Sequence, residues 1–119
     1  MNRVLLAGKD WQARALLRAQ LIEEGVDVEA HETISDASSS LEASEILPGL
    51  FIADLFASDN PAADIDELAR WSHDVPVWII ATHSMIVEAN LKGRGFELIL
   101  FRPVDLGGLV GQIKRRVEA

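Results

Sequence analysis

The chain of 119 residues contains no cysteine and no apolar stretch long enough to cross a membrane. The lack of cysteine excludes disulfides, thiolate metal ligands and a cysteine nucleophile, and it fits a reducing compartment. A membrane-spanning helix needs about 20 apolar residues in a row, so we expect no membrane association. Met1–Asn2–Arg3 lead directly into a strand-like segment, which leaves no room for a signal peptide. We therefore expect a cytoplasmic protein.

Positive charge is also scarce. Eleven Lys and Arg residues stand against nineteen Asp and Glu residues, a formal net charge of -8. A protein that binds a phosphate backbone needs a basic surface, so we expect no nucleic-acid partner. Hydrophobic residues at 49% and charged residues at 25% are ordinary for a globular protein. The length fits one domain, residues 1–119.

Strand and helix signals alternate along the chain. Short strand-like segments are separated by segments of helical periodicity. Four of them are apolar runs: Val4–Ala7, Leu50–Asp54, Pro76–Ala81 and Leu98–Phe101. The fifth, Val26–Ala30, alternates apolar and polar residues, as a half-buried strand near the sheet edge does. Five such strand–helix units build a parallel sheet with helices on both faces, because crossovers are right-handed. We expect a doubly wound (βα)5 α/β three-layer sandwich with a five-stranded sheet in the order 2-1-3-4-5.

Helix ends are marked by capping residues. Asp10 is expected to cap the first helix, Ser35 or Asp36 the second, Ser84 the fourth (Met85–Lys92) and Asp105 the fifth. The fifth helix contains Gly107, Gly108 and Gly111, and each glycine costs about 1 kcal/mol relative to alanine inside a helix. We expect these glycines to permit close packing on the sheet or on a partner, and the alternative is a dynamic helix.

Chemistry is expected at the carboxyl edge of the sheet, where parallel strands end. This edge brings together Gly8–Lys9–Asp10, Asp54, Ala81–Thr82 and Arg102. Asp54 ends an unbroken buried strand and would point into the crevice there. The alternative is that Asp54 caps the turn that follows it, which is a common use of aspartate after a strand.

This pattern resembles the CheY-like receiver domains of two-component response regulators, which have a flavodoxin-like fold. The resemblance rests on Leu17, Leu21 and Gly25 in the first unit, Asp54 ending the third strand, Pro76 opening the fourth, and Arg102–Pro103 after the fifth. It implies a signalling domain and not an enzyme. Asp54 would be the equivalent of the phosphoacceptor, Arg102 would replace the family lysine, and the Arg102–Pro103 bond would be cis.

The resemblance also implies a magnesium site, from which this sequence departs. In the family two acidic residues after the first strand hold the ion, together with the aspartate and a backbone carbonyl that would here belong to Phe56. The acidic pair falls on Gly8 and Lys9, and Asp10 lies one place too late. We expect no cofactor, and the alternative is a weak Mg²⁺ site formed by Asp54, Asp10 and the Phe56 carbonyl.

Two further family positions differ. The hydroxyl residue that ends the fourth strand falls on Ala81, so Thr82 is the alternative source of a hydroxyl. The switch aromatic falls on Ile99.

Lys9 brings a positive charge to the place of the metal. Two unit charges about 4 Å apart interact by roughly 4 kcal/mol at an effective dielectric of 20, so an ammonium there would repel a divalent cation. We hypothesise that the Lys9 ammonium pairs with Asp54, with Arg102 on the other side. The alternative is that Lys9 points to solvent and Asp10 helps to bind a weakly held metal.

The sequence therefore predicts a receiver domain in a phosphorelay, with a histidine kinase or phosphotransfer protein as its partner if Asp54 is phosphorylated. The alternative is a phosphorylation-independent pseudo-receiver, acting as a protein-interaction or dimerisation module through the fourth helix, fifth strand and fifth helix. A nucleotide-binding enzyme is a weaker third class, because Gly8–Lys9 lacks the second glycine and the hydroxyl residue of a phosphate-binding loop.

Overall fold

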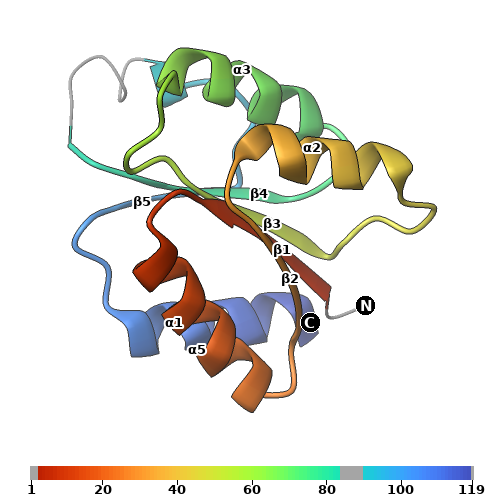
Figure 1. Ribbon diagram of the computed structural model, residues 1–119, viewed down its shortest axis with the longest axis vertical. Helices are drawn as coiled ribbons and strands as arrows, with labels where there is room; N and C mark the ends of the chain where they lie inside the picture. Colours follow the sequence, from red (N-terminus) through yellow and green to blue (C-terminus); the bar gives the residue numbers. More distant parts are fainter. Residues whose placement is uncertain (1–2, 84–89, 119) are drawn as a thin grey trace.

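The computed structural model describes residues 3–83 and 90–118, and Figure 1 shows a sheet between two layers of helices. The elements are β1 (Arg3–Gly8), α1 (Trp11–Glu23), β2 (Asp27–His31), α2 (Ile34–Ala43), β3 (Leu50–Asp54), α3 (Pro61–Trp71), β4 (Val77–Ala81), β5 (Leu98–Phe101) and α5 (Leu106–Glu118). All strand pairs are parallel, in the order β2-β1-β3-β4-β5. The predicted doubly wound fold is confirmed.

Alternating residues of the central strands supply two hydrophobic cores, because successive side chains of a strand point to opposite faces. On one face Leu5, Phe51 and Ile79 pack with α2 and α3. On the other face Leu6 and Ile52 pack with α1 and α5. Figure 1 shows these two helix pairs on opposite sides of the sheet. Burial on both faces explains why β1, β3 and β4 are continuously apolar.

Three further predictions, two helix caps and one cis peptide bond, are confirmed. The Asp10 carboxylate accepts the backbone N–H of Ala13 and so caps α1. In the same way Asp105 accepts the N–H of Gly108 at the start of α5. The Arg102–Pro103 peptide bond is cis.

The predicted cap of α2 is wrong. Thr33 is the N-cap: its hydroxyl accepts the N–H of Asp36, so the helix begins at Ile34. Ser35 lies in the first turn instead. The helix starts earlier because β2 ends at His31 and leaves only a two-residue connection.

The glycines of α5 do not pack closely on the sheet. Gly107 and Gly108 are exposed, and a Cβ built at Gly107 would meet no atom within 4 Å. For a Cβ at Gly111 the three nearest atoms would all belong to the side chain of Arg115, one turn further along the same helix. The sheet is instead contacted by Leu109 and Ile113, which form the buried stripe of the helix.

The predicted fourth helix, Met85–Lys92, lies largely outside the described residues. Of this span Asn90 and Leu91 are described and helical, and Leu91 is buried in the core shared with α2 and α3. None of the described helices is long and apolar enough to cross a membrane.

Candidate functional site

The strand register brings the candidate residues together at the carboxyl edge of the sheet. Gly8 at the end of β1 lies opposite Asp54 at the end of β3, and Asp54 lies opposite Ile80 on β4. Arg102 follows β5, and its backbone N–H donates to the carbonyl of Ala81 at 2.8 Å. Parallel pairing therefore delivers Asp54 and Arg102 to one crevice although 48 residues separate them.

Asp54 uses both carboxylate oxygens within the protein. Oδ1 accepts the backbone N–H of Phe56 at 3.0 Å, and Oδ2 accepts a hydrogen bond from Arg102 Nη2 at 2.5 Å. Only 11% of the Asp54 side chain is exposed. The carboxylate thus caps the turn after β3, as one interpretation of the sequence expected, and also points into the crevice, as the other expected.

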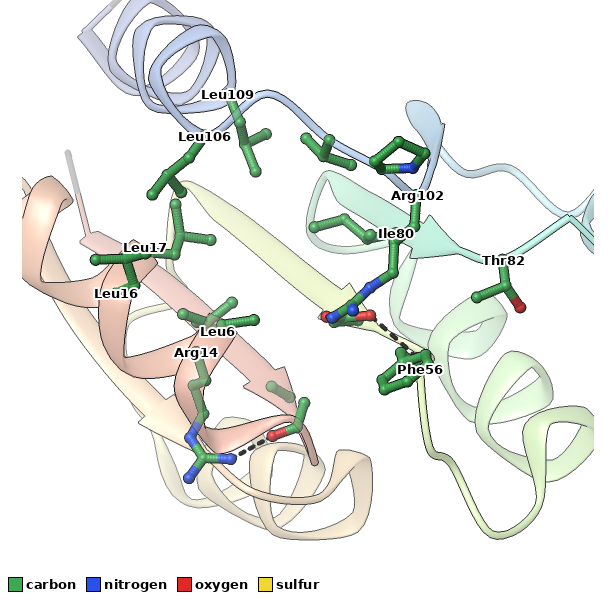
Figure 2. Close-up of a pocket in the computed structure, with 16 residues that line it drawn as sticks. Leu6, Arg14, Leu16, Leu17, Phe56, Ile80, Thr82, Arg102, Leu106 and Leu109 are labelled. Atoms are coloured by element: carbon green, nitrogen blue, oxygen red, sulfur yellow. Dashed lines mark hydrogen bonds and ion pairs between the residues drawn. The ribbon is translucent and has the colours of Figure 1, made fainter.

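Arg102 lies between two carboxylates. Its Nη2 also donates to Asp10 Oδ2 at 3.2 Å, and the guanidinium carbon lies 4.3 Å from the centre of the Phe56 ring (Figure 2). Burial lowers the pKa of Arg102, but the hydrogen bond and charge of Asp54, followed by those of Asp10, outweigh burial and raise the pKa above its usual value. The guanidinium is therefore a fixed positive charge in the crevice.

Asp10 reaches this site while it caps α1. The hydrogen bond from the Ala13 N–H lowers the pKa of Asp10, and burial raises it. The bond from Arg102 adds to the first effect, so the pKa of Asp10 is lowered. The Asp10–Arg102 pair was not predicted. The signal that could have suggested it is an acidic cap at the helix end that faces the crevice.

The predicted Lys9–Asp54 pair is wrong. As the alternative expected, Lys9 lies at the surface, with 31% of its side chain exposed, but Asp10, which that alternative placed in a weak metal site, binds Arg102. The Lys9 ammonium pairs with Asp59, in the loop between β3 and α3. These residues border a hollow of about 170 Å³ that also contains Glu32 and Asp64. The bond and charge of Asp59, aided by the charges of Glu32 and Asp64, raise the pKa of Lys9. This acidic group attracts Lys9 away from the arginine-paired Asp54.

Thr82 is exposed after the end of β4 and borders the same crevice as Arg102. Figure 2 shows its hydroxyl on the side away from the guanidinium. An aromatic contact that was not predicted lies nearby: the His83 ring stacks on Phe101 with 4.3 Å between ring centres. The register of Ala81 opposite Phe101 brings the two strand ends together, and no spacing in the sequence reveals that pair.

A magnesium ion does not fit the residues at this edge. The ion requires several oxygen ligands in octahedral geometry. Each oxygen of Asp54 and Asp10 accepts one N–H, and the Arg102 guanidinium bridges the two carboxylates, so its positive charge would repel a divalent cation bound to them. In the parts of the chain that the structure describes, no group of three or more His, Asp or Glu side chains could hold a metal.

Comparison of the sequence with protein-family models and with curated proteins finds no match. Comparison of the structure does find neighbours. The signal receiver domain of a Vibrio parahaemolyticus protein described as a Luxo repressor is 26% identical, with a TM-score of 0.77 over 98% of this chain and 90% of that chain. A receiver domain of a Syntrophus aciditrophicus signal transduction histidine kinase has a TM-score of 0.82 at 18% identity, covering 99% and 91% of the two chains.

A CheY-like receiver domain of Methanospirillum hungatei is similar as well, with a TM-score of 0.81 at 17% identity over 99% of this chain and 94% of that chain. These structural neighbours are consistently CheY-like receiver domains. The fold is that of the CheY-like receiver domains. In this receiver fold Asp54 and Arg102 occupy the strand ends at which the resemblance placed the phosphoacceptor and the lysine. Gly8 ends β1 and Lys9 follows it, at the positions where the resemblance implied an acidic pair.

Proposed function

We propose that the chain is a receiver-type signalling domain that acts through protein contacts, as a pseudo-receiver, without phosphorylation of Asp54. The receiver fold supports a role in two-component signalling. The observation that carries the proposal is the Arg102 guanidinium bound between Asp54 and Asp10, where a metal-dependent receiver needs a divalent cation and free carboxylate oxygens.

Phosphoryl transfer to a carboxylate brings together two negatively charged groups, so cations must neutralise the phosphoryl oxygens. Here Gly8 supplies no oxygen ligand, and the Lys9 ammonium is paired with Asp59. Each Asp54 oxygen accepts one hydrogen bond, from Arg102 or from the Phe56 N–H, and these bonds hold the carboxylate in place and lower its nucleophilicity. These features favour a carboxylate that serves as a structural anchor for Arg102.

For the partner we propose a protein or a second copy, bound through β5, α5 and the segment Met85–Lys92. Strand β5 is an edge of the sheet and its residues are half-buried, which leaves backbone groups for pairing. One structural neighbour, at 23% identity, is the beryllofluoride-activated NtrC4 receiver domain dimer. A histidine kinase or phosphotransfer protein would be the partner only if Asp54 were phosphorylated.

The test is phosphorylation with acetyl phosphate and Mg²⁺, read by intact mass. We expect no gain of phosphoryl mass in the wild-type chain or in Asp54→Asn, while a receiver domain that is phosphorylated under the same conditions serves as the positive control. A phosphoryl mass that Asp54→Asn abolishes would instead make the chain a phosphate-accepting receiver and overturn the proposal.

A further inference from the structure

A cavity of about 570 Å³ lies beside the Asp54–Arg102 pair, between α1 and α5. Figure 2 shows Leu16 and Leu17 of α1 facing Leu106 and Leu109 of α5, with Leu6 beneath them. The cavity opens to solvent, since Leu16 and Phe56 in its lining are 54% and 42% exposed. Pockets for small organic molecules are about 300–1,000 Å³ and mostly apolar, and the size and lining of this cavity match such a site.

The polar groups in and beside the cavity balance in charge, within an acidic chain. Its lining contains Arg14, Arg102 and Asp54, and Asp10 binds Arg102 from outside the lining, so two arginines face two carboxylates. The whole chain has a formal net charge of -8. An anion would therefore be repelled less in this cavity than over most of the protein surface, and the apolar walls weaken solvent screening of its attraction to the two guanidinium groups.

Arg102 retains hydrogen-bond donors for such an anion. Its two hydrogen-bond partners, Asp54 and Asp10, both bind Nη2, and in the described part of the chain Nε and Nη1 donate to no acceptor. Arg14 similarly uses Nη1 to bind the Gly8 carbonyl. A guanidinium has five N–H donors, so both arginines have donors left for a carboxylate.

We propose that this cavity binds a small amphipathic organic anion, with an apolar body between α1 and α5 and a carboxylate at Arg102. This inference goes beyond the proposed function and does not require it. Because Arg102 lies between β5 and α5, such a ligand would compete with Asp54 and Asp10 for the residue that connects the crevice to the proposed partner surface.

The test uses naphthalene-2-carboxylate as the probe and 2-naphthamide as its neutral analogue of the same shape. Each is titrated into the ¹⁵N-labelled protein while amide chemical shifts are followed. We expect the carboxylate to bind saturably, with shifts in α1, at the end of β4 and in the β5–α5 connection. We also expect it to bind about tenfold more tightly than the amide, the effect of one charge-assisted contact.

Matched variants test the position of the site. Leu16→Trp should block the cavity and weaken carboxylate binding about tenfold or more, whereas Ile22→Trp, on the same helix but outside the cavity, should not. Leu16 and Ile22 are similarly exposed, at 54% and 46%. Likewise Arg102→Gln should remove the preference for the carboxylate, and the exposed Arg18→Gln should keep it.

Three results would overturn the proposal. Equal affinity for the carboxylate and the amide would exclude an anion site, and carboxylate affinity unchanged by Leu16→Trp would exclude this cavity. Shifts that centre on Trp11 and Ile22 and depend on protein concentration would assign the surface to a second copy of the chain. Phosphorylation of Asp54 would overturn the proposed function, but it would not change the result of this ligand titration. Failure of the proposed function and failure of this inference are therefore distinguishable.

Discussion

Replacing Arg102 with glutamine should lower the free energy of unfolding by about 2 kcal/mol, between the 0–1 of exposed ion pairs and the 3–5 of a broken buried pair. An intermediate value is expected because 26% of the Arg102 side chain and 11% of the Asp54 side chain are exposed. For a chain of this length each kcal/mol shifts the melting temperature by about 3–4 °C, so we expect a loss of about 7 °C.

A double-mutant cycle isolates the pair from other effects of the substitution. Urea denaturation of the wild type, Arg102→Gln, Asp54→Asn and the double variant gives the coupling free energy, which we expect to be about 1–2 kcal/mol. The matched control is the Arg94–Asp66 pair, in which 71% of the Asp66 side chain is exposed. Its coupling should be below about 0.5 kcal/mol.

Coupling between Arg102 and Asp54 as weak as that of the control pair would refute the reasoning. It would mean that solvent screens the guanidinium and that the Asp54 carboxylate is available to other ligands. The proposal that Asp54 serves as a structural anchor for Arg102 would then have to be abandoned.

Three further predictions concern charge and backbone conformation. Lys9→Asp should allow Mg²⁺ to raise the melting temperature, since it replaces a cation by a carboxylate in the acidic hollow, and wild type with Mg²⁺ should show no such rise. Gly107→Ala should stabilise the chain by about 0.5–1 kcal/mol in urea denaturation because the position is open and helical, whereas Gly25→Ala should destabilise it because φ is +80° there. The hydrogen bond from the Ser38 hydroxyl lowers the pKa of Glu67; burial opposes this effect, and the bond and charge of Arg70 add to it. The ionised Glu67 carboxylate therefore stabilises the folded chain at neutral pH, and this contribution is lost on acidification. The stability difference between wild type and Glu67→Gln, measured by urea denaturation, should therefore shrink as pH falls from about 5 to 3; a rise in the same range would contradict it.

The alternation of apolar runs and helical segments was enough to predict the sheet order and the strand that carries Asp54. This works because a strand buried on both faces must be continuously apolar, and because crossover handedness leaves few topologies. Capping by Asp10 and Asp105 was also predictable, since a cap involves residues three positions apart. The cap of α2 was not, because Thr33, Ser35 and Asp36 can all serve and the end of β2 selects among them.

The partner of each charge at the crevice was decided only by the tertiary structure. From the sequence, Lys9 was expected to pair with Asp54, because both lie at the carboxyl edge of the sheet. The loop after β3 instead brings Asp59 to Lys9 from 50 residues away, and Arg102 binds Asp54 and Asp10. Long side chains select partners by distances across several elements, which no local pattern records. The sequence by itself therefore determined the fold, the position of Asp54 at a strand end and the absence of acidic side chains at Gly8 and Lys9. The pairing of charges and the cavity between α1 and α5 arise only when the strands and helices pack together.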